Sequence, residues 1–186
     1  MFKQFCVVCK NMSRFIRFIV IAIATAFKAP DTLLVFGGAG ATGSEIVYQA
    51  LQRGERVRVL VRDPKKLMLP RVSSKLRTRA LMRSEDLEIL RGDVTNPEDV
   101  ERCFEKSDVK GVCIALGGKT AEVGKTMLEV GTGHIVEQML DRSCSRISIV
   151  SSIGCGDSIN QAPAFFRLLM MTALSDAIKD KNNQEK

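Results

Sequence analysis

A glycine-rich stretch, VFGGAGATGSEIV at residues 35–47, has the composition of a phosphate-binding turn. Its glycines fit two spacings: G-x-G-x-x-G over Gly38, Gly40 and Gly43, and G-x-x-G-x-x-G over Gly37, Gly40 and Gly43. Because glycine has no Cβ, the backbone can approach a phosphate closely, and a helix that begins here adds N–H donors and its positive dipole end. No Gly-Lys-Ser/Thr follows, so the stretch is not a mononucleotide P-loop. It predicts a pyrophosphate site, with a ligand-free turn as the alternative.

A second pair of candidates follows the apolar run RVRVLV, where Arg62 and then Asp63 come next. Sheets that bind NAD place an acidic residue here on the ribose 2′-hydroxyl, whereas an arginine fork can pair with the 2′-phosphate of NADP. Arg62 therefore favours NADP(H), while Asp63 and a plain surface Arg–Asp pair leave the alternative open. Further along, Asp93 is placed to accept from an adenine amino group and Val94 to cover the ring, although Asp after a strand is also an ordinary turn residue.

Apolar strands and amphipathic helices alternate after Asp31. The glycine-rich stretch and the Arg62-Asp63 pair therefore each follow an expected strand. We expect strands at Thr32–Phe36, Arg56–Val61, Leu87–Leu90, Val112–Leu116 and Arg146–Ser151. We expect helices at Ser44–Arg53, after an Asn96 cap, around Leu128–Leu140, and one or two within Ala162–Ile178. Five such rounds predict an α/β fold: a doubly wound, Rossmann-like parallel sheet of order 3-2-1-4-5 with helices on both faces.

The net charge of +7 suggests a nucleic-acid partner, but its distribution argues against one. Residues 1–30 hold five basic and no acidic residues, which leaves +2 for residues 31–186. A nearly neutral body does not require a nucleic-acid-binding face, and the basic stretch from Lys65 to Arg83 is interpreted as a solvated surface. We therefore expect no nucleic-acid partner.

The cysteines and the single histidine give no metal or disulfide pattern. An isolated C-x-x-C pair lies near the amino terminus and four more cysteines are scattered, which predicts reduced thiols; they are Cys6, Cys9, Cys103, Cys113, Cys144 and Cys155. His134 lies beside the apolar stripe of its helix and is interpreted as a structural histidine rather than a catalytic one.

Residues 1–30 have the features of a targeting leader. A basic start precedes an apolar run from Phe18 to Ala26, which is too short to cross a bilayer comfortably, and Ala24-Thr25-Ala26 has the small-x-small pattern of a cleavage site. The sequence ATAFKAP resembles the Ala-Phe junction of two-part plastid-targeting leaders in algae with secondary plastids. We therefore expect a plastid protein, with a mitochondrion or the secretory pathway as alternatives. Membrane contact is expected only through an uncleaved leader, and residues 31–186 form the folded domain.

The order of the motifs resembles the atypical short-chain dehydrogenase/reductase proteins. VFGGAGATG, VLVRDPKKL, GDVTNPEDV, ALGG, GTGHIVEQM and ISIVSSIGCGDS, across about residues 32–160, resemble the NAD(P)-binding group that contains flavin reductase (biliverdin-IXβ reductase) and its NmrA-like relatives. The resemblance implies an NADP(H) site. It assigns the diphosphate to Gly37, Gly40, Ala41, Thr42 and Gly43, the 2′-phosphate to Arg62, the adenine to Asp93 and Val94, the nicotinamide side to Leu116, Gly117 and Gly118, and the region near the substrate to Ser151 and Ser152.

The sequence departs from this family in two respects. Its only tyrosine is Tyr48, on the first helix, so the Tyr-x-x-x-Lys pair of short-chain dehydrogenases is missing and no catalytic residue is assigned. Flavin reductases of the resembled type need little acid–base help, which implies hydride transfer from NADPH to a flavin, quinone or similar conjugated small molecule. The alternative is a non-catalytic NADP(H)-binding redox sensor or scaffold. The chain also stops before the family's C-terminal substrate segment, which leads us to expect self-association through the apolar C-terminal helix face.

Overall fold

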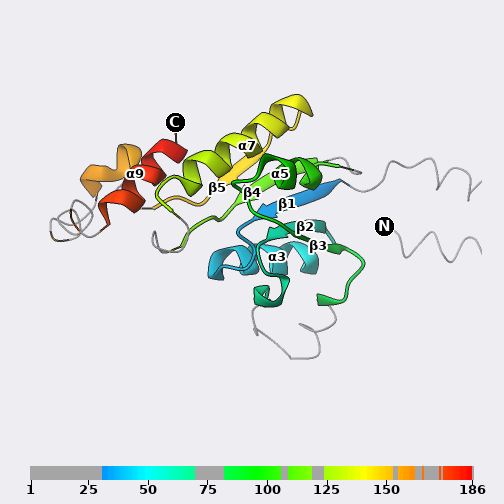
Figure 1. Ribbon diagram of the computed structural model, residues 1–186. Helices are drawn as coiled ribbons and strands as arrows, with labels where there is room; N and C mark the ends of the chain where they lie inside the picture. The colour runs from blue at the N-terminus through cyan, green and yellow to red at the C-terminus, as the bar shows by residue number, and fades with distance from the viewer. Residues whose placement is uncertain are drawn as a thin grey trace, which may run out of the picture. The chain divides into compact units, whose positions relative to one another are not determined.

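The computed structural model describes residues 31–69, 82–105, 109–118, 124–152, 155–161, 165, 172 and 174–185. The predicted leader, much of the basic stretch and most of the predicted helix at Ala162–Ile178 lie outside them. One parallel sheet has the order β3-β2-β1-β4-β5, which confirms the predicted fold class and strand order (Figure 1). Its strands are β1 (Thr32–Phe36), β2 (Arg56–Val61), β3 (Leu87–Arg91), β4 (Val109–Ile114) and β5 (Ile147–Ile149).

Helices cover both faces of this sheet. They are α3 (Ala41–Gln52), α5 (Pro97–Cys103), α7 (Met127–Asp141) and α9 (Ser175–Gln184), with short 3₁₀ helices η2 (Pro64–Lys66) and η3 (Gly156–Gln161). The α5 helix begins as predicted, because the Asn96 side chain accepts from the Glu98 N–H at 3.0 Å and Pro97 occupies the first turn. The α3 helix begins at Ala41, three residues before the predicted start.

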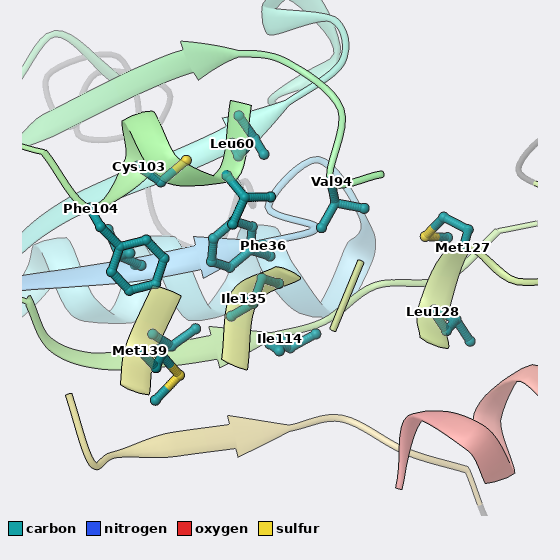
Figure 2. Packing of buried hydrophobic residues seen from close by; sticks show 13 residues of the cluster. Phe36, Leu60, Val94, Cys103, Phe104, Ile114, Met127, Leu128, Ile135 and Met139 are labelled. Carbon is teal, nitrogen blue, oxygen red and sulfur yellow. The ribbon is translucent and has the colours of Figure 1, made fainter. Parts of the chain in front are cut away.

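Two hydrophobic clusters lie on opposite faces of the sheet. Alternate residues of β1 divide between them, since Leu34 and Phe36 join the first cluster and Val35 joins the second. The first cluster packs α5 and α7 on the sheet, and Figure 2 shows Phe36 and Ile114 of the strands near Ile135 of α7. The second packs α3 against β1 and β2. Because both faces are covered, β1 is apolar after Thr32 rather than alternating.

The ends of β4 and β5 differ from the prediction. The β4 strand begins at Val109, where it pairs with Thr32 across an irregular register, and ends at Ile114 rather than Leu116. The Ala115 N–H still donates to the Phe36 carbonyl at 2.8 Å, but the chain then leaves the sheet. The β5 strand, Ile147–Ile149, is shorter than the predicted Arg146–Ser151, because β4 no longer pairs with it beyond Ile114.

The four described cysteines are free thiols, as predicted. Burial raises the pKa of the Cys103 thiol to about 12, so this side chain stays neutral and acts as a small apolar group. In the described part of the chain no helix has both the length and the apolar composition needed to cross a membrane. Nor do three His, Cys, Asp or Glu side chains gather there as a metal site would require.

Arg58 is a buried charge in the middle of β2, only 5% exposed. Its guanidinium pairs with Glu88 of β3 at 2.7 Å and donates to the carbonyl oxygens of Cys103 and Glu105 at 2.6 and 2.7 Å. These two carbonyls lie at the end of α5, where helical C=O groups have no partner in the helix and favour a cation. Arg58 therefore connects the end of α5 to β2 and β3.

We expect Arg58→Met to lower the free energy of unfolding by about 3 kcal/mol, because the substitution leaves two carbonyls without a donor. Glu88→Gln is the matched control. It should cost about 1 kcal/mol or less, because the Glu88 side chain is half exposed and water replaces its interaction. Urea denaturation measures both, and equal losses would contradict the assignment to the α5 carbonyls.

Candidate functional site

A cleft opens at the carboxyl-terminal edge of the sheet, where the ends of β1, β2, β3 and β4 meet. Its volume is about 140 Å³. Ligands of doubly wound sheets bind at this edge, near the point where strand order reverses between β1 and β4. The cleft is lined by Phe36, Gly37, Ala39, Gly40, Leu60, Val61, Arg62, Gly92, Val94, Ala115, Leu116, Gly117 and Met127.

The turn between β1 and α3 forms one wall, and its glycines are required by close contacts. Gly37 has a φ of +84°, and a Cβ there would lie 2.3 Å from the Ala115 carbonyl oxygen. A Cβ at Gly43 would lie 2.1 Å from the Gly37 carbonyl oxygen. Gly38 instead faces away from the cleft, since its Cβ would meet the Val59 side chain at 2.3 Å. Of the two possible spacings, the cleft therefore favours G-x-x-G-x-x-G.

The amino-terminal end of α3 has free donors. Its first intrahelical bond runs from the Ser44 N–H to the Gly40 carbonyl at 2.9 Å, and no described group accepts from the N–H groups of Ala41, Thr42 or Gly43. Gly40 provides no capping side chain, and the first turn holds no acidic residue. Three unpaired N–H groups at the positive end of a helix dipole form an anion site.

Arg62 and Asp63 have different local roles at the end of β2. The Asp63 carboxylate caps η2 by accepting from the Lys65 N–H at 3.0 Å. Arg62 is exposed, lines the cleft and forms no ion pair with any described residue. The alternative of a surface Arg62–Asp63 pair is therefore not observed, and the guanidinium remains available to a ligand.

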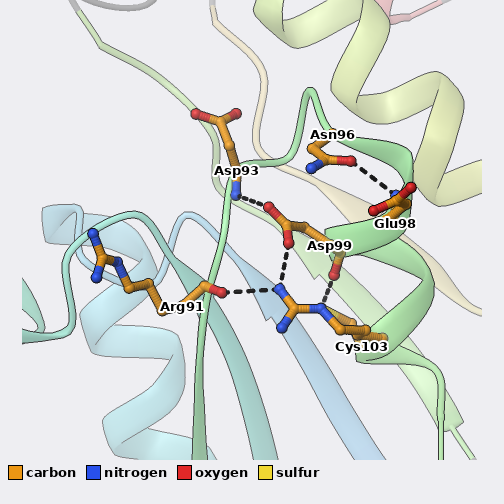
Figure 3. A network of polar contacts seen from close by, with 7 residues as sticks. Arg91, Asp93, Asn96, Glu98, Asp99 and Cys103 are labelled. Carbon is orange, nitrogen blue, oxygen red and sulfur yellow. Dashed lines mark hydrogen bonds and ion pairs between the residues drawn. The ribbon is translucent and has the colours of Figure 1, made fainter.

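The opposite wall is the loop between β3 and α5, which Asp99 holds in place (Figure 3). Asp99 accepts from the Asp93 N–H at 2.8 Å and pairs with Arg102, which also donates to the Arg91 carbonyl at 3.1 Å. A Cβ at Gly92 would lie 2.7 Å from the Asp99 carboxyl carbon, so the carboxylate fits only against glycine. The polar network thus fixes the backbone immediately before Val94.

Asp93 itself does not line the cleft. Its carboxylate accepts from the backbone N–H and the hydroxyl of Thr95, at 3.0 and 2.8 Å, which is the turn role that the sequence left open for it. Val94 lines the cleft and is buried against α7, where a Cβ at Gly131 would touch its side chain at 2.7 Å. His134 also contacts the Val94 carbonyl through Nδ1 at 3.2 Å. The histidine therefore contacts the backbone of this wall.

The predicted nicotinamide side divides into residues that line the cleft and residues that do not. Leu116 and Gly117 line it, and Gly118 is exposed directly after them. Ser151 and Ser152 follow β5 and are absent from the lining. The Ser151 hydroxyl donates to Glu185, the residue after α9, and the Ser152 carbonyl accepts from the Cys155 N–H at 3.2 Å.

Several lining residues were not predicted from the sequence. Phe36, Leu60 and Val61 lie at or next to the ends of their strands, and Ala115 just beyond the end of β4, so the rule that ligands bind at the carboxyl ends of strands was a usable signal for them. Met127 carried no such signal, because it is the first residue of α7 and its place depends on how that helix packs.

Comparisons with known proteins agree with this architecture. Residues 37–186 match the model of a family described as NAD(P)H-binding. The chain is similar to ChuY, an anaerobilin reductase from Escherichia coli O157:H7, with 18% identity and a TM-score of 0.59 over 83% of this chain and 65% of that one. It is also similar to a wide-type short-chain dehydrogenase/reductase from Veillonella parvula in complex with NADP, with 14% identity and a TM-score of 0.62 over 84% and 63% of the two chains.

A curated relative is more similar in sequence but much longer. Over 129 residues the chain is 30% identical to a bifunctional UDP-glucose 4-epimerase and UDP-xylose 4-epimerase from Pisum sativum. The match covers 64% of this chain and 36% of the pea protein. The chain thus spans about a third of that relative.

We expect Gly37→Ala to lower the free energy of unfolding by about 3 kcal/mol, since it combines a positive φ with a clash against the Ala115 carbonyl. Gly54→Ala is the matched control, because Gly54 has a φ of +75° with no atom within 4 Å of its Cβ position. The control should cost about 1 kcal/mol from the backbone conformation alone. Thermal and urea unfolding measure the difference between the two variants. Equal losses would show that the Ala115 carbonyl leaves space for a Cβ at residue 37.

Proposed function

Because the chain belongs to the NAD(P)H-binding family, we propose that it binds NADP(H) in the cleft and transfers hydride from NADPH to a flavin, quinone or similar conjugated acceptor. The observation that carries this proposal is the amino-terminal end of α3, with three unpaired N–H groups beside a turn that excludes side chains. A diphosphate satisfies these donors and is stabilised by the helix dipole.

The described residues fit the coenzyme along the cleft. Gly37 and Gly40 let the diphosphate approach the backbone, while Ala41, Thr42 and Gly43 donate their N–H groups. The missing Cβ atoms have a separate effect at two positions: at Gly38 the turn packs closely on Val59 of β2, and at Gly43 the start of α3 packs closely on the Gly37 carbonyl. The neighbouring NADP complex from Veillonella parvula supports a coenzyme of this type.

Arg62 supports the choice of NADP(H) over NAD(H). Its guanidinium is exposed at the cleft, without a partner among the described residues, and can form two parallel bonds with a 2′-phosphate. Asp63 already accepts from η2, so it competes poorly for a ribose 2′-hydroxyl. Val94 then covers the adenine, and the backbone near Asp93 borders it.

The acceptor lies beyond Leu116, Gly117 and Gly118, at the end of the cleft opposite Arg62. When bound, the coenzyme supplies a hydride to an electron-poor conjugated system. The similarity in fold to an anaerobilin reductase supports a reductase function. Binding of NADP(H) without turnover is the alternative, and it is favoured by Tyr48, whose hydroxyl accepts from Gln52 at 2.5 Å on α3 and supplies no acid to the cleft.

We expect Arg62→Ala to weaken NADPH binding by about 10- to 100-fold, because it removes charge-assisted bonds to the 2′-phosphate. NADH binding should stay unchanged, which calorimetry on the same protein can check. Arg53→Ala is the matched control, since Arg53 is an exposed arginine at the opposite end of α3 and its loss changes net charge equally. An equal loss for both coenzymes would contradict the assignment of Arg62 to the 2′-phosphate.

We expect the chain to oxidise NADPH in the presence of FMN or a quinone such as menadione, which absorbance at the reduced nicotinamide band follows directly. NADPH binding is measured beside it. Binding without turnover on any acceptor would reject the reductase and support the non-catalytic alternative.

A further inference from the structure

Where the hydrogen-bond ladder between β4 and β5 ends, a lysine of α9 takes the place of the next strand donor. Its last bond runs from the Val150 N–H to the Ile114 carbonyl at 2.8 Å. In a regular parallel ladder the next bond would run from the Leu116 N–H to the Val150 carbonyl. That carbonyl instead accepts from the Lys181 ammonium of α9 at 2.8 Å. The ammonium thus lies at the carboxyl end of β5, on the carbonyl that β4 would have bonded had it continued to Leu116.

The α9 helix is held firmly against α7, which fixes where Lys181 lies. Asp180, 4% exposed, accepts from the N–H groups of Leu128 and Glu129 at 2.9 Å each, and so caps α7 from a distant part of the chain. Gln184, buried one turn later, donates to the Thr132 hydroxyl at 2.9 Å. The capped turn of α7 begins at Met127, which itself lines the cleft.

Further polar groups surround the ammonium. The Ser151 hydroxyl donates to the Glu185 carboxylate, which lies so close to Gly156 that a Cβ there would meet it at 2.3 Å. Glu185, directly after α9, is one helical turn from Lys181, and Lys181 also donates to the Gln184 side chain at 2.8 Å. Two of the three ammonium N–H groups thus have acceptors among the described residues, and none of those residues accepts from the third.

We propose that Lys181 is the general acid of the acceptor site, held by Val150 and Gln184 at the junction of β4 and β5, and that the acceptor is a conjugated carbonyl compound. This inference rests on the proposed function and narrows its acceptor class. A flavin needs no acid when it accepts a hydride, whereas a conjugated carbonyl does. The position of Lys181 supplies a proton donor where the sequence has no tyrosine.

The chemistry balances with the coenzyme already proposed. Hydride adds to the β-carbon of the conjugated carbonyl, and the C=C electron pair moves to leave a negative charge on the carbonyl oxygen. Lys181 transfers one proton to this enolate, which becomes the saturated carbonyl compound, and regains a proton from water through its exposed neighbours Ser151 and Glu185. The net reaction consumes the acceptor, NADPH and one proton, and yields the reduced acceptor and NADP⁺.

The surroundings suit a lysine in this role. Burial lowers the pKa of the Lys181 ammonium, and the nearby Cys155, Glu185 and Asp180 offset part of this effect. A lysine whose charged form is partly desolvated is a stronger acid than one in water. Arginine at the same place would keep the charge but would not release a proton.

The test compares 2-cyclohexen-1-one, which needs a proton, with FMN, which does not, on the full chain. We expect Lys181→Met and Lys181→Arg each to lower kcat for cyclohexenone by about 100-fold and to change kcat for FMN by less than about threefold. The wild type should show a solvent deuterium isotope effect with cyclohexenone only. Lys179→Met, on the exposed face of the same helix, should leave both activities unchanged.

Several outcomes would overturn the assignment. A wild type that reduces FMN but not cyclohexenone, equal losses with both acceptors, or full activity of Lys181→Arg would each reject Lys181 as the acid. Calorimetry with NADPH is run on every variant. If the wild type does not bind NADPH, the proposed function itself is rejected. This result is distinct from one that rejects only the role of Lys181.

Discussion

Two points in the turn between β1 and α3 leave no space for a Cβ atom, and the site depends on both. At Gly37 the backbone packs against the Ala115 carbonyl, and at Gly43 the first turn of α3 packs against the Gly37 carbonyl. These contacts fix the direction in which α3 leaves the sheet. They also place the amino-terminal end of α3, with its uncapped N–H groups, directly after Gly40, which lines the cleft.

The same close contact shapes the opposite side of the crevice. Because Ala115 is held against the turn, β4 stops pairing with β5 at Ile114, and the following residues, Leu116 and Gly117, separate from the sheet to line the cleft. The gap left beside the end of β5 is occupied by the Lys181 side chain of α9. A constraint in the first thirteen residues of the domain therefore determines what a helix near residue 180 can contact.

Local sequence patterns predicted the sheet, whereas contacts between distant residues determine the parts of the site that were not predicted. The alternation of apolar runs and the glycine spacing were enough for the strand order and for an NAD(P)-binding family, both of which are confirmed. The cap of Asn96 on α5 was equally local. The cap of Asp180 on α7 joins residues about fifty positions apart, so no spacing indicated it, and Asp93 had two local roles between which sequence gave no decision.

Competition among helix ends explains why one site at this edge would take the diphosphate. Three helices, α3, α5 and α7, begin near the carboxyl ends of the strands. The α5 end is satisfied by Asn96 and two acidic residues, and the α7 end by the buried Asp180 carboxylate. Only α3, among the described helices that begin there, has neither a capping side chain nor an acid in its first turn. An anion that enters the crevice therefore meets repulsion at two helix ends and attraction at the third.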